Sequence, residues 1–345
     1  MIRVLVCEDS STARQLLVQI LRASPDVEVV GEARDGVEAV ELTKQLRPNA
    51  VTMDINMPRM DGLAATKEIM IAAPTPIVIV TGSASINDVS FALDALRAGA
   101  LAVLPRPQGP LTPGFAEAAR KLLETVKSMS QVKVVRHWRA VPGSKIFGAG
   151  GSPAPAVGQA RAQIVAVAAS TGGPAALHHL LSKLPGHFAV PILVVQHITA
   201  GFTPGLAVWL RTAGPLDVKV AEHGELLRPR TVYLSPDDWH LEATPTGAVE
   251  LSKAPPVGGF RPSGSRLFES AAQAYGARTL AVILTGMGND GVAGLKMVRL
   301  AGGRIIAQDE KSSVIFGMPG AAVAAGLADD VLPLEAIAGR LAQLV

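Results

Sequence analysis

The first 124 residues alternate short apolar runs with amphipathic segments of helical period. Apolar residues fill each run almost completely, as in strands that are buried on both faces of a sheet. The segments between them, such as 13–22 and 37–46, repeat apolar residues at helical spacing. Five such units predict a parallel, doubly wound α/β sheet. The predicted strands are 2–7, 27–30, 50–53, 77–80 and 101–104.

A second region with the same rhythm begins at Gln163. A helix is expected from Pro174 and a hairpin over 243–253, and the other runs predict a second doubly wound parallel sheet. Its predicted strands are 164–168, 190–195, 231–234, 280–284 and 304–307. Between the two regions the periodicity fades into Gly, Pro and Ser, which is typical of a linker. We therefore predict a first domain over 1–124, a flexible linker over 125–160 and a second domain over 161–345.

Composition narrows the class of protein. The 345 residues suffice for two domains with their own cores, and the single cysteine, Cys7, excludes an internal disulfide. No charged and apolar leader and no apolar stretch of about 18–20 residues is found, so we expect a cytoplasmic protein without membrane insertion. The linker carries 5 basic and no acidic residues, against 12 and 15 before it and 15 and 14 after it. We interpret this basic excess as a solvated tether.

Polar residues gather where the strands of the first predicted sheet end. Because the carboxyl ends of parallel strands meet at one rim, these side chains are expected to lie together. The carboxylates favour a hard cation such as Mg²⁺, which would reduce the repulsion between Asp54 and an incoming phosphate. Each acidic residue by itself is also an ordinary helix cap. The residues at the rim are Glu8, Asp9, Asp54, Thr81 and Arg106.

The motifs around these residues resemble the receiver domain of two-component response regulators, which has a flavodoxin-like fold. They are 7–10, 53–62, Thr81, 98–100 and 106–107. The resemblance implies phosphorylation of Asp54 by a chemotaxis histidine kinase, and a Mg²⁺ site formed by Glu8, Asp9, Asp54 and the carbonyl of Asn56. It also implies that Thr81 and Arg106 respond to the phosphoryl group.

Two positions in the first domain differ from the pattern of receiver domains. Arg106 stands where the family has a lysine, and its planar guanidinium can still pair with phosphate as a fork. Val103 stands where the aromatic partner of the switch threonine is usual. The usual coupling of threonine to an aromatic ring therefore cannot operate unchanged here.

In the second domain, a serine, a histidine and a carboxylate each follow a predicted strand: Ser170, His197 and Asp290. These are the groups that serine-based acyl transfer requires. Ordinary alternatives remain: Ser170 or Thr171 as a helix cap, 169–173 as a turn that binds a nucleotide phosphate, His197 as a structural residue, and 288–291 as a tight turn. Spacing does not prove that the three groups meet.

The second region also resembles the catalytic domain of the chemotaxis protein-glutamate methylesterases, the CheB family. The resemblance implies a Rossmann-like α/β domain with a Ser170–His197–Asp290 triad and oxyanion donors near Thr171 and Met287. It further implies hydrolysis of glutamyl methyl esters, and deamidation of glutamines, on methyl-accepting chemoreceptors, without a cofactor in this domain. Phe260 replaces an expected histidine. The matching motifs are 169–173, 196–197, 201–203, 261–263, 284–291 and 316–319.

Two other classes of protein are alternatives to a hydrolase. A non-catalytic signalling module would bind a receptor or partner through the second domain without turnover, and a nucleotide-binding protein would use 169–173 to hold phosphate. Nucleic-acid binding is not expected, since Trp138, Trp209 and Trp239 are dispersed and no helix-turn-helix pattern is found.

Overall fold

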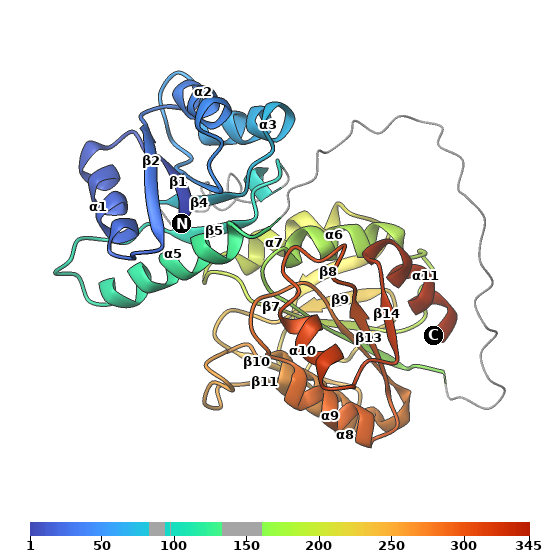
Figure 1. The fold of residues 1–345 in the computed structure, drawn as a ribbon. Coiled ribbons are helices and arrows are strands. Elements are labelled where there is room, and N and C mark those ends of the chain that lie inside the picture. Colours follow the sequence, from blue (N-terminus) through green and yellow to red (C-terminus); the bar gives the residue numbers. More distant parts are fainter. Residues whose placement is uncertain (83–93, 97, 133–160) are drawn as a thin grey trace, which may run out of the picture.

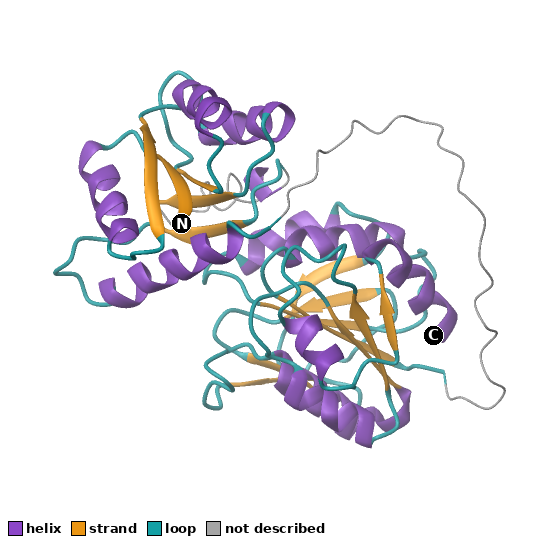
Figure 2. Ribbon diagram, in the orientation of Figure 1, coloured by secondary structure: helices purple, strands orange, loops and turns teal. Residues whose placement is uncertain are grey.

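The computed structural model describes residues 1–82, 94–96, 98–132 and 161–345. These residues form two parallel β-sheets, each covered by helices on both faces, and a small hairpin (Figures 1 and 2). The prediction of two doubly wound parallel α/β sheets is therefore confirmed. No helix in the described part of the chain is long and apolar enough to cross a membrane.

The first sheet has the strand order β2-β1-β3-β4-β5, with all neighbours parallel. Helices α1 and α5 pack on one face, and α2 and α3 on the other. The bounds are β1 (Ile2–Cys7), α1 (Ser11–Arg22), β2 (Val27–Ala33), α2 (Gly36–Leu46), β3 (Ala50–Met53), α3 (Gly62–Ala72), β4 (Ile77–Thr81), β5 (Ala102–Pro105) and α5 (Phe115–Met129).

Helix α5 ends later than the predicted domain boundary at residue 124. Its buried stripe continues through Leu122, Val126 and Met129, which pack against the first sheet, so the helix runs five residues into the segment predicted as linker. From residue 133 to 160 the predicted linker lies outside the described residues. Of the predicted linker, the structure describes residues 125–132.

The second sheet has seven parallel strands in the order β14-β13-β12-β6-β7-β9-β8. Helices α6, α7 and α11 cover one face, and α8, α9 and α10 the other. The bounds are β6 (Ile164–Ala169), α6 (Gly173–Lys183), β7 (Ile192–Gln196), α7 (Thr203–Arg211), β8 (Asp217–Val220), β9 (Thr231–Leu234), α8 (Gly264–Tyr275), η1 (Gly276–Arg278), β12 (Thr279–Ile283), α9 (Val292–Leu300), β13 (Arg304–Gln308), α10 (Met318–Ala324), β14 (Asp330–Leu332) and α11 (Leu334–Leu344).

The predicted hairpin is the antiparallel pair β10 (His240–Ala243) and β11 (Val249–Ser252). Strands β8 and β14 were not predicted. Both are short edge strands that are largely exposed or half-buried, so they lack the continuous apolar run that marked the central strands.

The order of strands in the second sheet creates a crevice beside β6. Strand β7 lies on one side of β6 and β12 on the other, so the connections diverge at this point. Ligands of open α/β sheets bind beyond the carboxyl ends of the strands at such a switch point. The loops after β6, β7 and β12 are therefore the place to look for a site.

Candidate active site and acidic cluster

Ser170 is held in a tight turn directly after β6. Its amide donates to the Thr285 carbonyl (3.0 Å) and its carbonyl accepts from the Gly173 amide (2.8 Å), which opens α6. Gly172 between them has φ +78°, and a Cβ there would lie 2.6 Å from Val314 Cβ, so only glycine fits the turn. The turn presents Ser170 beside the N-terminus of a helix that begins with Gly173-Pro174.

Gln196, the last residue of β7, joins the loops after β6 and β7. Its Nε2 donates to the carbonyls of Ser170 and His197, each at 2.8 Å. A side chain at Gly173 would overlap Gln196 Oε1, so this glycine makes room for the amide. The backbones of Ser170 and His197 are thus joined by the buried side chain at the end of β7.

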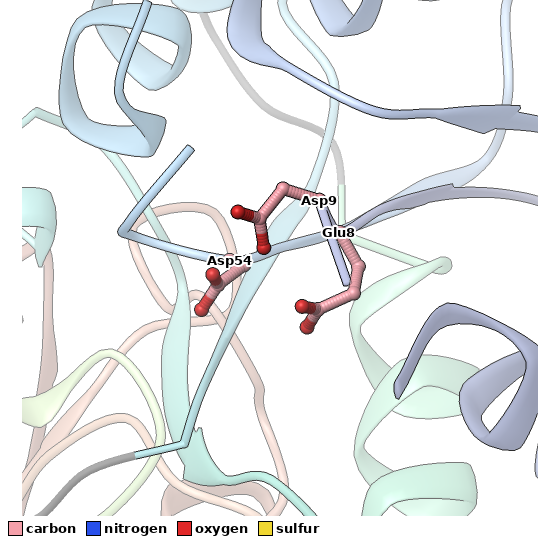
Figure 3. Close-up of side chains that lie close together, drawn as sticks. All are labelled: Glu8, Asp9 and Asp54. Carbon is pink, nitrogen blue, oxygen red and sulfur yellow. The ribbon is translucent and has the colours of Figure 1, made fainter. Parts of the chain in front are cut away.

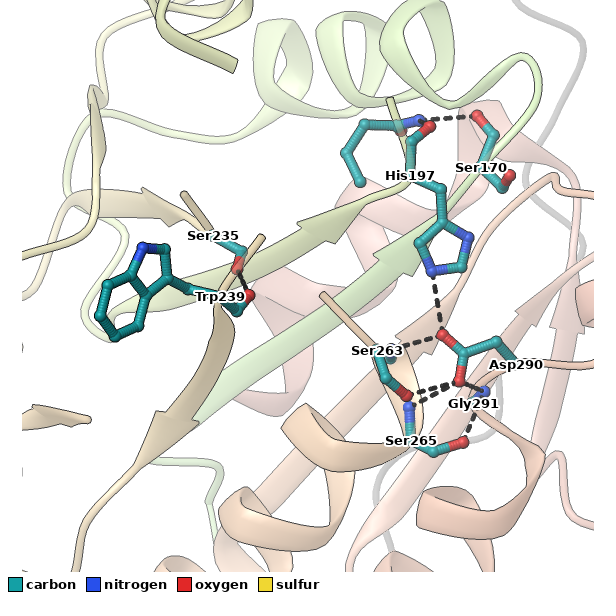
Figure 4. Close-up of polar contacts among 10 residues, drawn as sticks. Ser170, His197, Ser235, Trp239, Ser263, Ser265, Asp290 and Gly291 are labelled. Atoms are coloured by element: carbon teal, nitrogen blue, oxygen red, sulfur yellow. Dashed lines mark hydrogen bonds and ion pairs between the residues drawn. The ribbon is translucent and has the colours of Figure 1, made fainter. Parts of the chain in front are cut away.

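His197 contacts Asp290 through Nε2, at 2.9 Å from Oδ2. The other ring nitrogen, Nδ1, is buried and has no hydrogen-bond partner in the described part of the chain. Figure 4 shows Nδ1 on the side of the ring toward Ser170, and Asp290 on the opposite side. Among the described residues no hydrogen bond joins Ser170 Oγ to the ring.

Four donors at the starts of α8 and α9 hold the Asp290 carboxylate. Oδ1 accepts from Ser263 Oγ (2.8 Å), the Ser265 amide (3.1 Å) and the Gly291 amide (2.8 Å), and Oδ2 accepts from the Gly264 amide (2.6 Å) (Figure 4). Burial by itself raises the pKa of Asp290, but the bonds from His197, Ser263 and Gly264 outweigh it and keep the pKa well below its usual range. The carboxylate is therefore ionised beside the imidazole.

The turns after β6 and β12 lie side by side at the same rim. Gly286 precedes Met287 and packs so closely on Ser170 that an added Cβ would lie 2.8 Å from the serine Cβ. In the described part of the chain, the Thr171 and Met287 amides donate to no protein acceptor. Both stay predicted oxyanion donors.

A cavity of about 320 Å³ separates this rim from the N-terminal half. Ser170, Thr171 and His197 line one side, together with Phe260 and Met287. The other side is formed by residues of β5, of α5 and of the segment before β5: Leu96, Leu101, Ala102, Val103, Leu104, Lys121, Glu124 and Thr125. Residues of the first half of the chain therefore lie across the cavity from Ser170.

Direct contacts hold the two halves at this cavity. Ser128 of α5 donates to Met287 Sδ at 3.0 Å, and Thr199, two residues after His197, donates to the Val103 carbonyl of β5 at 3.4 Å. Ile315 packs against the apolar cluster of the first sheet. The face made by β5 and α5 is thus in contact with the loops after β7 and β12.

At the rim of the first sheet, Glu8, Asp9 and Asp54 come together (Figure 3). One carboxylate oxygen from each lies within 4.8 Å of the others. Burial, followed by the charge of Glu8, raises the pKa of Asp54 to about 7. Oxygen donors at this spacing, destabilised by their mutual repulsion, fit a hard divalent cation. Asn56 lies in the exposed loop after Asp54, and its carbonyl stays a predicted ligand.

Arg106 pairs with the buried Glu8, with Nη1 at 2.8 and 2.9 Å from the two carboxylate oxygens. Burial raises the pKa of Glu8 above its usual value, and the hydrogen bond and the charge of Arg106 offset only part of this rise. A side chain at Gly82 would overlap the guanidinium, so glycine makes room for an arginine here. Thr81 Oγ1 is buried and has no hydrogen-bond partner among residues 1–82, 94–96, 98–132 and 161–345. The hydroxyl and the cation thus border the acidic cluster.

Comparison with known proteins gives the class and then the family. The fold and the two rims are those of a receiver domain joined to an α/β domain with a serine, histidine and aspartate at its switch point. The family model "Response regulator receiver domain" matches residues 4–111, and "CheB methylesterase" matches residues 165–341. The chain belongs to the CheB methylesterase family.

Individual relatives agree with this assignment. The chain is 58% identical to protein-glutamate methylesterase/protein-glutamine glutaminase 4 of Myxococcus xanthus, over 99% of this chain and 96% of that protein. It is 55% identical to the enzyme numbered 3 of Anaeromyxobacter dehalogenans, over 99% and 98%. The crystal structure of the Thermotoga maritima CheB methylesterase catalytic domain matches with a TM-score of 0.52 and 41% identity, covering 54% of this chain and all of that domain.

Several residues of the site had no role assigned from the sequence. Ser263, Gly264 and Ser265 surround Asp290, a contact that the motif 261–263 does not predict. Gln196 follows no pattern that would predict its bonds to the Ser170 and His197 carbonyls. A helix start of the form Ser-Gly-Ser signals free amides, but nothing in the sequence shows which carboxylate they receive.

Proposed function

We propose that this protein is a phosphorylation-controlled serine hydrolase that demethylates glutamyl methyl esters, and deamidates glutamines, on methyl-accepting chemoreceptors. The observation that carries the proposal is the His197–Asp290 pair, whose Nδ1 is left without a partner on the side toward Ser170. Membership of the CheB family and the names of the close relatives support the choice of ester and amide.

The first half of the reaction forms an acyl-enzyme. Ser170 Oγ attacks the carbonyl carbon of the glutamyl methyl ester, and His197 Nδ1 accepts the hydroxyl proton. Asp290 accepts the hydrogen bond from Nε2–H and so holds the tautomer in which Nδ1 is the base. The Thr171 and Met287 amides donate to the oxyanion of the tetrahedral intermediate. The proton then passes from Nδ1 to the leaving oxygen, and methanol departs.

The second half restores the serine. A water gives a proton to His197 Nδ1 as its oxygen attacks the acyl carbon, and the second intermediate collapses with the proton returned to Ser170 Oγ. The product is a free glutamate carboxylate. With a glutamine side chain the same acyl-enzyme forms, and ammonia leaves in place of methanol.

We assign the acidic cluster of the first half to phosphorylation at Asp54 by a chemotaxis histidine kinase. Glu8, Asp9 and Asp54, with the Asn56 carbonyl, would hold Mg²⁺, which supplies positive charge beside the transferred phosphoryl group. The unpartnered Thr81 hydroxyl is available to the phosphoryl oxygens. Arg106 would exchange part of its bond to Glu8 for the phosphoryl group, as a planar fork can.

Control follows from the cavity between the halves. The face made by β5 and α5 lies across the cavity from Ser170, and we propose that a receptor segment reaches the serine only when that face moves. Phosphorylation adds charge at Asp54 and alters the end of β5 through Arg106. Strand β5 contacts the loop after His197 through Val103 and Thr199, so this route needs no aromatic switch residue. The division into a domain over 1–124, a linker and a domain over 161–345 remains part of the proposal.

The test is methanol release from methylated chemoreceptor membranes. Wild type is compared with Ser170→Ala and Asp54→Asn, each with and without acetyl phosphate and Mg²⁺. We expect release that rises with the phosphodonor in wild type, a low basal rate without response in Asp54→Asn, and none above background in Ser170→Ala. Full release by Ser170→Ala would contradict the hydrolase, and a response in Asp54→Asn would contradict the control. ATP-dependent thermal protection of Ser170→Ala would favour the nucleotide-binding alternative.

A further inference from the structure

Phe260 lies flat against the imidazole of His197. The two ring centroids are 4.3 Å apart and the ring planes differ by 7°. Asp290 contacts the edge of the imidazole at Nε2. Phe260 packs on one face of the same ring. Phe260 also lines the cavity that contains Ser170.

A glycine turn builds this stack. Val257 and Phe260 exchange two backbone hydrogen bonds, each of 3.0 Å, across Gly258 and Gly259. Both glycines have positive φ, 60° and 86°, as a two-residue turn of the primed type requires. The turn is therefore closed by its own backbone, and it fixes where the phenyl ring emerges.

The residues after the turn anchor it to the rest of the site. Arg261 pairs with Asp238, at 2.7 Å through Nη2, and donates from Nη1 to the Lys253 and Ala254 carbonyls. Ser263 follows and donates to Asp290. The segment 260–263 thus contacts the imidazole face through Phe260 at one end. At the other end Ser263 holds Asp290, which contacts the imidazole edge.

From this geometry we infer that Phe260 is a positioning residue, which holds the His197 ring in its reactive orientation and stabilises the imidazolium formed when Ser170 gives up its proton. The inference rests on the proposed hydrolase function. A phenyl face within about 6 Å of a cation attracts it through the ring quadrupole, and a neutral imidazole gains much less. The stack therefore favours the charged state that forms during each half of the reaction.

Other charged groups around the ring do not replace this contribution. Asp290 contacts Nε2 and also favours the charged ring, from the edge. Three further charged residues line the cavity. Arg261 pairs with Asp238. The other two, Lys121 and Glu124, lie on α5, and Glu124 pairs with Arg120. All of these remain in a Phe260 variant, so a change in the pH response reports the loss of the aromatic face.

The experiment compares full-length Phe260→Leu, which keeps apolar bulk but has no π face, with Phe260→Tyr, which keeps the face. Each is assayed for methanol release with acetyl phosphate over a range of pH, and the His197 ring proton is titrated by NMR, with His197→Gln to assign it. In Phe260→Leu we expect kcat to fall about fivefold, and the acidic limb of kcat/KM and the NMR midpoint to move about half a pH unit lower. KM is expected to change less than kcat, and Phe260→Tyr to restore the wild-type values.

The outcomes separate the two proposals. An NMR midpoint and an acidic limb that are unchanged in Phe260→Leu would overturn the role of Phe260, even in a fully active enzyme. A fall in kcat that Phe260→Tyr does not restore would also overturn it. Wild type that releases no methanol would count against the hydrolase itself, while the NMR titration would still test the stack.

Discussion

His197 and Asp290 are joined through Nε2 of the imidazole, at 2.9 Å, and this leaves Nδ1 as the nitrogen on the side of Ser170. In the familiar serine-protease triad the two nitrogens have the opposite assignment, with Nδ1 toward the aspartate. His197 follows β7 and Asp290 follows β12, the two strands that flank β6, and Ser170 follows β6 itself. The roles of a triad thus depend on orientation, not on which nitrogen is used.

The first prediction concerns the tautomer of His197. In Asp290→Asn the amide can donate to Nε2, so the ring proton moves to Nδ1 and the base toward Ser170 is lost. We expect kcat for methanol release to fall by about 10⁴, as for the corresponding change in serine proteases. Asp217→Asn, which changes an exposed carboxylate on the edge strand β8, is the matched control. Activity within tenfold of wild type in Asp290→Asn would show that the aspartate does not set the tautomer.

The second prediction concerns stability in acid. The pKa of Asp290 is lower in the folded protein than in the unfolded chain, so its ionised form stabilises the fold fully above about pH 4, the usual pKa range of aspartate. This contribution is lost as the pH falls from there toward the folded pKa. The difference in unfolding free energy between wild type and Asp290→Asn should therefore shrink below about pH 4, measured by urea unfolding. A constant difference from pH 7 to pH 3 would argue against an ionised, bonded carboxylate.

The third prediction concerns the acidic cluster. Mg²⁺ should raise the melting temperature of the first half, because a ligand at ten times its Kd stabilises the folded state by about 1.4 kcal/mol. Asp54→Asn removes one of three clustered carboxylates and should reduce the Mg²⁺ effect, while Glu28→Gln, on an exposed position of β2, should not. Differential scanning calorimetry with Mg²⁺ or EDTA provides the measurement. Equal Mg²⁺ effects in wild type and Asp54→Asn would place the cation elsewhere.

The fourth prediction concerns the face made by β5 and α5, across the cavity from Ser170. Ser128 contacts Met287, so a long side chain at residue 128 should separate α5 from the loop after β12. We expect Ser128→Arg to raise basal methanol release severalfold and to reduce the further gain from acetyl phosphate. Ala116→Arg, at an exposed position on the same helix, serves as control. If Ser128→Arg has the basal rate of Ala116→Arg, contact at α5 does not restrain the enzyme.

The sequence predicted both sheets because their central strands are continuous apolar runs, and it placed Ser170, His197 and Asp54 at strand ends. Strands β8 and β14 escaped because half-exposed edges have no such run. The Ser263–Ser265 donors, the Phe260 stack and the Ser128–Met287 contact join segments far apart in the chain. Periodicity reports which face of an element is buried, but contains no information on which loop meets which, so these contacts required the structure.

The most direct test of the central claim is covalent labelling of the serine. A fluorophosphonate that reacts with activated serines is added to the full chain in acetyl phosphate and Mg²⁺, and the adduct is located by peptide mass spectrometry. We predict one adduct, on Ser170, formed in step with the loss of methanol release and absent from Ser170→Ala. An adduct elsewhere that abolishes activity, or none on Ser170 in an enzyme that still releases methanol, would contradict the proposal that Ser170 is the nucleophile.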